Sequence, residues 1–303
     1  TIPKSKSLQT IPFLRQTNSH FSQPILQNLL KIKQFVTELQ ENNEQTKDFF
    51  RLAFGSILIP CSRLKRSPSL GYPKKEKKLD SNIPFKLFNE KVSQIISDLE
   101  WARDNLNKIP ESKIINGDSR KISKLGKKVD MALTSPPYIN GMDYVINYKI
   151  ENVWLDFAKT YEELKELKDS MIVCDNVSKH LYTNYKSKYH DPWIEKIANL
   201  LQKRLEEKGN YRRNDMHNLV RKYFDDLYPV LKNTYENLKD DGKFHIVIGD
   251  SLMAGIYIPA DILVGKMGIS LGYKLEDIKI ARKRWSGQRH DFQLRESIVV
   301  LKK

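Results

Sequence analysis

The fold class is decided by the stretch Val129-Asp130-Met131-Ala132-Leu133-Thr134-Ser135-Pro136-Pro137-Tyr138. Its first part is a short apolar run of the kind found in a buried strand. Two consecutive prolines then end the strand, because proline has no amide hydrogen for the ladder. The ring of Tyr138 follows at the carboxyl end of the strand, which is where open α/β sheets place their ligands. The stretch therefore predicts an α/β fold with a ligand site at Ser135 to Tyr138.

These residues suit the methylation of an exocyclic amine of a nucleobase. Such an amine is a poor nucleophile because its lone pair is delocalised into the ring, so a catalyst must accept hydrogen bonds from the amino hydrogens. The hydroxyl of Ser135 is one acceptor, and the fixed φ of Pro136 can direct the carbonyl of Ser135 or Pro136 as a second. Tyr138 can stack on a base that has been rotated out of the duplex. The alternative, that Pro136-Pro137 only terminates a core strand, is disfavoured by the order strand, Ser, Pro-Pro, Tyr.

The motif resembles that of the amino-methyltransferases of DNA, in which Asp, Asn or Ser precedes Pro-Pro-Tyr or Pro-Pro-Phe. The Ser form is commoner among the N4-cytosine enzymes and the Asp form among the N6-adenine enzymes. Lys113 to Ser119 looks like the preceding strand and turn, while residues 140–155 and 242–251 look like the following loop, helix and core strand. The resemblance implies that Asp118, near the adenine end, and Thr134 bind S-adenosylmethionine.

The resemblance covers roughly residues 50 to 303 in the order of elements. It implies a Rossmann-like, S-adenosylmethionine-dependent methyltransferase sheet that is incomplete at its N-terminal side and carries a helical insertion. The implied activity is site-specific DNA methylation in restriction-modification, with cytosine N4 as the favoured target and adenine N6 as the alternative. The implied catalytic residues are Ser135, Pro136, Pro137 and Tyr138, acting on a flipped base.

A second signature of that family, the glycine turn Phe-x-Gly-x-Gly, does not occur in this sequence. Phe54-Gly55-Ser56 is the nearest match, but it lies in the apolar run 49–60, which has no second glycine and predicts a helix. The glycines after residue 251 lack a preceding strand. We therefore expect the turn on a missing N-terminal segment or on a second polypeptide, and the opening at Thr1, without an initiator methionine, favours the former.

The net charge of +15 and the pI near 9.5 favour a polyanionic partner, which we expect to be double-stranded DNA. The composition, 40% hydrophobic and 29% charged, is ordinary for a globular protein. A membrane surface is the competing partner, but the sequence has no long apolar span and no signal peptide. Cys61 and Cys174 have no zinc-like spacing, which predicts reduced thiols in a cytoplasmic protein and no metal site.

Three cationic segments are candidates for contact with DNA. The loop 62–78 mixes cations with Pro, Ser and Gly, and a solvated loop that binds nothing is an almost equally weighted alternative. Residues 282–290 link two strand-like runs, which predicts a hairpin tip. Residues 179–193 interleave aromatics with cations, so they form either a target-recognition surface or the small core of a helical subdomain, and we weight the two about evenly. The candidate contacts are Arg63, Lys65, Arg66, Lys74, Lys75, Tyr185, Arg284 and Arg289.

The predicted organisation has four parts. These are a helical segment 1–110, which contains the basic loop, the catalytic-motif part 111–159, a target-recognition insertion 160–215 and the remainder of the sheet 216–303. Apolar spacing predicts helices near 20–58, 85–107, 194–208 and 222–238, and strands at 243–249, 275–281 and 297–301. Two other functions stay open. The chain can be a non-catalytic DNA-binding subunit, which the missing glycine turn favours, or an RNA methyltransferase, which we rank below DNA because no RNA-binding module is recognisable.

Overall fold

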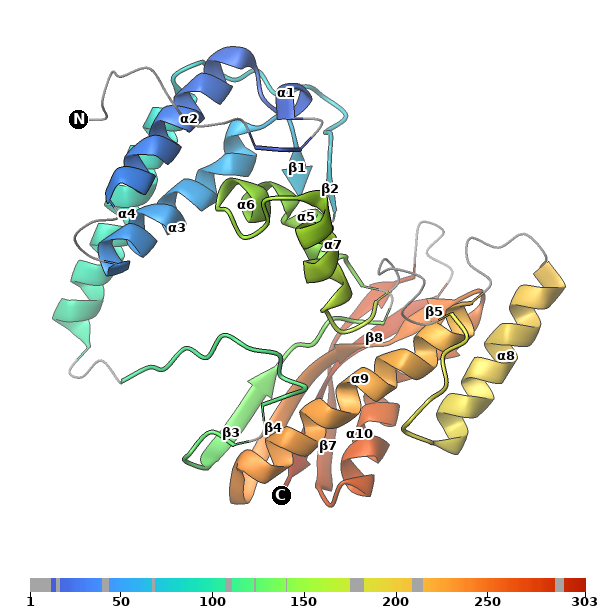
Figure 1. Cartoon of the computed structure of the whole chain (residues 1–303). Helices are drawn as coiled ribbons and strands as arrows, with labels where there is room; N and C mark the ends of the chain where they lie inside the picture. The colour runs from blue at the N-terminus through green and yellow to red at the C-terminus, as the bar shows by residue number, and fades with distance from the viewer. Residues whose placement is uncertain are drawn as a thin grey trace. The chain divides into compact units, whose positions relative to one another are not determined.

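A computed structural model describes residues 12–14, 17–39, 44–66, 69–106, 111–122, 124–139, 141–174, 183–208, 215–286 and 292–303. The chain forms two compact units, which are labelled by element in Figure 1. The helical unit comprises residues 1–113 and 144–168, and the sheet unit comprises residues 114–143 and 169–303. Residues 144–168, most of which we had grouped with the catalytic motif, thus pack with the N-terminal helices.

The helical unit is built on amphipathic helices. They are α1 (Thr17–His20), α2 (Gln23–Glu38), α3 (Glu44–Cys61), α4 (Ile83–Asn105), α5 (Tyr144–Asn147), α6 (Lys149–Trp154) and α7 (Tyr161–Asp169). α2, α3, α4 and α6 share one apolar core, in which Leu26, Leu29, Phe54, Leu58 and Trp154 are buried. The helices predicted near 20–58 and 85–107 are confirmed. Phe54-Gly55-Ser56, the nearest match to the glycine turn, lies inside α3 and is therefore helical, as its sequence predicts.

The basic loop between α3 and α4 contains a short antiparallel pair of strands, β1 (Lys65–Arg66) and β2 (Leu70–Gly71). The rest of residues 62–78 has neither helix nor longer strand among its described positions. The prediction of a loop is therefore confirmed, with one small hairpin added.

The sheet unit contains a four-stranded mixed sheet in the order β3-β4-β8-β7. The strands are β3 (Val129–Thr134), β4 (Leu238–Gly249), β7 (Lys274–Trp285) and β8 (Gln293–Lys302). β3 runs parallel to β4, and the other neighbours are antiparallel. The predicted strands are confirmed, although β4, β7 and β8 are longer than expected. Helices α8 (Pro192–Lys208), α9 (Met216–Asn237) and α10 (Ala260–Ser270), with the hairpin β5 (Ser251–Met253) and β6 (Ile256–Ile258), complete an α/β unit.

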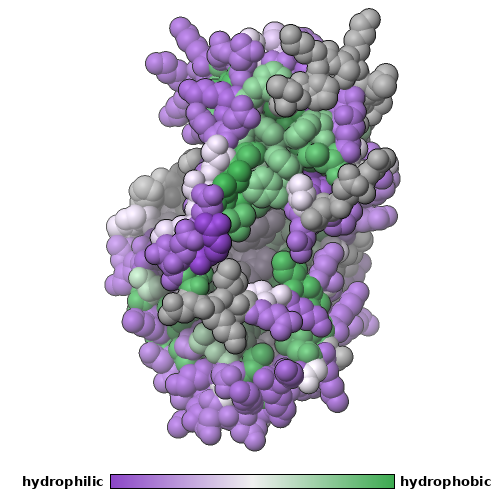
Figure 2. Space-filling model, turned by 90° about the vertical axis from the view of Figure 1, so that its left-hand side faces the viewer, coloured by the Kyte–Doolittle hydropathy of each residue, from purple (hydrophilic) through white to green (hydrophobic). Residues whose placement is uncertain are grey.

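Helices of the same unit cover one face of this sheet, and the other face has exposed apolar side chains on β3. On the covered face, Phe244, Ile246 and Ile248 pack in a core with side chains of α9 and α10. On the other face, Met131 and Leu133 are 61% and 69% exposed. The outer edge of β3 pairs with no strand in the part of the chain that the structure describes. In the lower half of Figure 2, hydrophobic side chains of this unit lie at the surface among hydrophilic ones.

The strand expected at Lys113 to Ser119 is not formed. Residues 111–118 adopt neither helix nor strand. A strand persists when its backbone groups pair with a neighbour, and the described sheet ends at β3. The side chains of residues 111–117 are exposed, so no packing holds the segment against the free edge of β3.

No helix in the described part of the chain is both long enough and apolar enough to cross a bilayer.

Candidate functional site

The segment Ser135-Pro136-Pro137-Tyr138 leaves the carboxyl end of β3 and packs against the end of the parallel strand β4. Ser135 is exposed, whereas Pro136 is buried. A Cβ atom added to Gly249, the last residue of β4, would lie 2.7 Å from two ring carbons of Tyr138. Glycine is therefore required at position 249, because only a residue without a side chain lets the ring pack so closely on the strand end.

The backbone of this segment is held from two sides. The hydroxyl of Tyr223, a fully buried residue of α9, donates a hydrogen bond to the carbonyl oxygen of Pro137 over 2.8 Å. The amide of Gly141 donates to the carbonyl oxygen of Tyr138, also over 2.8 Å. The carbonyl of Pro137 thus already accepts from Tyr223, and the role of the carbonyl of Ser135 or Pro136 as second acceptor stays a prediction.

The side chain of Tyr138 is half-buried and in contact with polar groups. Burial raises the pKa of its hydroxyl, and the neighbouring Ser135 and Glu296 act on this pKa in opposite directions. The guanidinium of Arg284 lies 6.0 Å from the ring centroid. Glu296 pairs with Arg282 over 2.8 Å, and this hydrogen bond lowers the pKa of Glu296. The structure thus brings the motif residues together with side chains of β7 and β8.

Arg284, predicted as a DNA contact, is engaged within the sheet unit. Its Nη2 donates to the carbonyl oxygen of Asp250 over 2.6 Å. The carboxylates of Asp250 and Asp261 are fully buried and are bridged by Arg295, at 3.0 Å and 2.9 Å. Burial raises the pKa of Asp261. This cluster fixes the chain just after β4, next to the ring of Tyr138.

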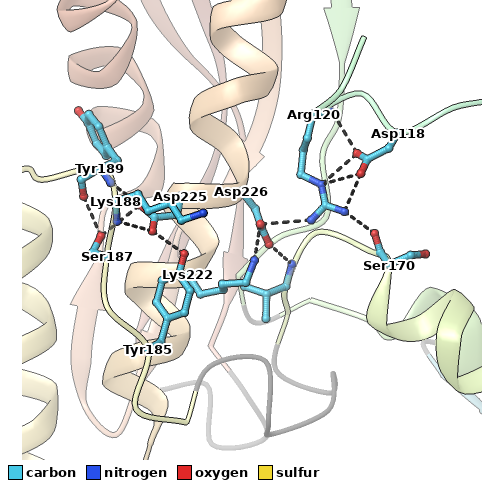
Figure 3. A network of polar contacts seen from close by, with 11 residues as sticks. Asp118, Arg120, Ser170, Tyr185, Ser187, Lys188, Tyr189, Lys222, Asp225 and Asp226 are labelled. Carbon is cyan, nitrogen blue, oxygen red and sulfur yellow. Dashed lines mark hydrogen bonds and ion pairs between the residues drawn. The ribbon is translucent and has the colours of Figure 1, made fainter.

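Asp118, predicted as a cofactor contact, lies in a polar network drawn in Figure 3. Its carboxylate accepts hydrogen bonds from Nε and Nη2 of Arg120, each at 2.9 Å, and these bonds lower its pKa. Arg120 also pairs with the buried Asp226 of α9 over 3.2 Å. Thr134, the other predicted cofactor contact, is the last residue of β3 and is half-buried.

The arginines of the basic loop form ion pairs within the helical unit. Arg66 pairs with Glu151 over 2.7 Å and lies 4.2 Å from the ring centroid of Tyr148. Arg63 lies 3.7 Å from Glu76. The exposed cations among the predicted contacts in this loop are Lys65, Lys74 and Lys75.

Among the described aromatics of residues 183–193, Tyr185 and Tyr189 contact α9, whereas Trp193 is 57% exposed. The hydroxyl of Tyr185, a predicted DNA contact, donates to Asp225 over 2.6 Å. The ring of Tyr189 stacks on that of Tyr228, with centroids 4.8 Å apart. The contacts of Tyr185 and Tyr189 fit the alternative interpretation, in which the aromatics of this segment form a small core within their own subdomain. Arg289 lies outside the described residues.

In the described part of the chain no group of three or more His, Cys, Asp or Glu side chains could hold a metal ion.

The chain is similar to Type II methyltransferases. It is 25% identical to the Type II methyltransferase M.AvaI of Nostoc sp. over 157 residues, which are 50% of this chain and 32% of that protein. It is 25% identical to the Type II methyltransferase M.BsoBI of Geobacillus stearothermophilus over 238 residues, which are 71% of this chain and 43% of that protein. The chain thus spans less than half the length of these curated relatives. No family model matches the chain, and no solved structure matches it.

Proposed function

We propose that this chain is the catalytic part of a site-specific DNA methyltransferase of a restriction-modification system. It would transfer a methyl group from S-adenosylmethionine to an exocyclic base amine, with cytosine N4 as the favoured target. One observation carries the proposal: Ser135 to Tyr138 stand at the carboxyl end of β3, with a backbone held by Tyr223 and a ring seated on Gly249. The similarity to Type II methyltransferases and the net charge of +15 support it.

The role of the motif follows from the chemistry of the amine. The exposed hydroxyl oxygen of Ser135 and a carbonyl of Ser135 or Pro136 accept the two amino hydrogens, so that the lone pair of nitrogen is freed for attack. The ring of Tyr138 supports the extruded base on its accessible side. Because Tyr223 and Gly249 fix the segment before substrate arrives, these acceptors need no rearrangement during the reaction.

The residues present do not by themselves fit S-adenosylmethionine. Close approach of backbone amides to its methionine half needs a glycine turn, and this sequence has none of the Phe-x-Gly-x-Gly type. The carboxylate of Asp118 is held by Arg120 and offers at most one side of a pocket.

We further propose that a segment or second polypeptide carrying the glycine turn adds to the outer edge of β3. Support comes from that unpaired edge, and from the exposure of Met131 and Leu133 on a sheet face that doubly wound folds cover with helices. Calorimetric titration tests this: residues 1 to 303 alone should bind S-adenosylmethionine weakly or not at all, and adding the segment should restore binding. Tight binding by the chain alone would contradict it.

The target base and the catalytic role are tested together. The completed protein, incubated with duplex DNA and S-adenosylmethionine, should yield N4-methylcytosine by mass spectrometry of the digested DNA. If N6-methyladenine were found instead, the target would be adenine N6, the alternative that the motif allows. Binding of cofactor and DNA without any methylated base would favour a non-catalytic DNA-binding subunit, the second candidate that the missing glycine turn supports.

A further inference from the structure

A cavity of about 620 Å³ lies in the sheet unit; Asp118 and Tyr185 line it, and none of residues 135–138 does. Its walls come from α9, from the turn at residues 118–121 and from the loop at residues 185–190. Figure 3 shows much of its polar lining. On α9, Tyr223, Leu227 and Leu231 face the core, whereas Lys222, Asp225 and Pro229 line the cavity. The cavity and the carbonyl of Pro137 therefore lie on different sides of this helix.

The carboxylates of the cavity are already occupied. Asp225 accepts hydrogen bonds from Tyr185, from Ser187 and from the amides of residues 188 and 189. Asp226 accepts from Arg120, Lys222 and the amide of Val173. Asp118 accepts from Arg120. A carboxylate has about four lone-pair sites, so these three groups have little capacity left for a ligand.

The groups that remain for a ligand are donors and ring faces. Lys121 and Lys188 are exposed, and Lys121 lies close enough to Asp118 to help lower the pKa of that carboxyl. The stacked rings of Tyr189 and Tyr228, with the ring of Tyr185, supply apolar walls. Planar bases stack on tyrosine, lysines bind phosphate, and the volume lies in the range of small-molecule sites.

We propose that this cavity binds a nucleotide, with the base on the tyrosine rings and the phosphate at Lys121 and Lys188. The nucleotide can be free or can belong to a nucleic-acid strand, because both present the same base and phosphate. This function goes beyond the methyl transfer proposed above and does not depend on it.

Calorimetric titration of residues 1 to 303 with deoxyadenosine 5′-monophosphate tests the proposal. The nucleotide should bind, and deoxyadenosine, which lacks the phosphate, should bind at least about tenfold more weakly. The double substitution Lys121→Ala with Lys188→Ala should remove most of that difference. The matched control, Lys127→Ala with Lys128→Ala, replaces two exposed lysines of the same unit outside the cavity and should leave affinity unchanged.

The rings are tested separately. Tyr228→Ala should weaken nucleotide and nucleoside alike by about tenfold, since stacking is lost, whereas Tyr228→Phe should keep the affinity. A twelve-nucleotide single strand distinguishes the sources: binding of the strand alone, lost in the double lysine variant, identifies a strand as the donor of the nucleotide. Nucleotide and strand binding that ignores both lysines, no binding of either probe, or displacement of the nucleotide by S-adenosylmethionine would overturn the proposal.

Discussion

Tyr223 fixes the acceptor segment through one hydroxyl, and its phenylalanine variant isolates that contact. Tyr223→Phe leaves the carbonyl of Pro137 without its 2.8 Å donor. Tyr273, another buried tyrosine of the same core, donates to the carbonyl of Leu231 over 2.9 Å and provides a matched control. Both variants should lower the free energy of unfolding by about 1 kcal/mol.

The two variants should differ in catalysis. In the completed protein, Tyr223→Phe should lower the single-turnover methyl-transfer rate about tenfold, which corresponds to a misplacement cost of about 1.4 kcal/mol in the transition state. Tyr273→Phe should leave that rate unchanged, and DNA affinity should be the same in both. Equal rates in the two variants would show that Tyr223 is structural only.

The motif and its neighbours show what sequence can reveal at this scale. The prolines and Tyr138 predicted the strand end because their effect on the backbone is local. Tyr223, Gly249 and Glu296 were missed, since they reach Tyr138 and Pro137 only through the tertiary fold. Arg284 was predicted as a DNA contact, and nothing local to it indicates its bond to the carbonyl of Asp250.

At the scale of elements, the free outer edge of β3 is a site through which the chain can self-associate. An edge strand with a free side and exposed apolar side chains pairs readily with another chain. We expect residues 1 to 303 alone to self-associate in sedimentation experiments, and Leu133→Lys to reduce this association. Ile280→Lys, at a residue of β7 that is 46% exposed, is the control and should have no such effect. If both variants self-associated as strongly as the native chain, the proposed role of β3 would be contradicted.

The helix α1 ends at His20, a buried residue whose ring nitrogens have no hydrogen-bond partner among the described residues. Burial lowers the pKa of His20 from 6.5 to about 4, with a smaller contribution from Lys149. Below pH 6.5 His20 therefore binds a proton in the unfolded chain, whereas in the folded chain it stays neutral down to about pH 4. The stability of the helical unit should fall by about 3 kcal/mol between pH 7 and pH 4 for this reason.

Hydrogen exchange of the α2 amides measures this loss. In His20→Leu the part of the acid sensitivity that comes from the imidazole should vanish, so that the variant loses less stability over the same interval. An identical loss in both proteins would place the acid sensitivity elsewhere.

The helices and strands themselves were largely predictable. Helical spacing predicted α2, α3, α4, α8 and α9, because each buries one apolar face. The strand expected before Ser119 is not formed, since pairing with β3 would need tertiary packing, and the side chains of residues 111–117 are exposed. The hairpin of β5 and β6 was missed because its strands are only three residues long.

For the whole molecule, the charge of +15 concerns association rather than chemistry. Exposed lysines such as Lys65, Lys74 and Lys75 can neutralise phosphates, and each neutralised phosphate adds to the salt dependence of DNA binding. The division into a helical unit and a sheet unit was only partly visible in the sequence. Residues 144–168 follow the motif directly, yet their apolar side chains complete the core of the N-terminal helices.

Single-turnover methyl transfer by Ser135→Ala tests the central claim most directly. The chain, completed by a polypeptide with the glycine turn, is mixed with tritiated S-adenosylmethionine and duplex DNA. The variant should bind DNA as the native protein does but transfer the methyl group more slowly by about a hundredfold, since an acceptor that acts in the transition state is lost. Ser97→Ala, at an exposed serine of α4, should transfer at the native rate. Native transfer by Ser135→Ala would contradict the assignment of the site.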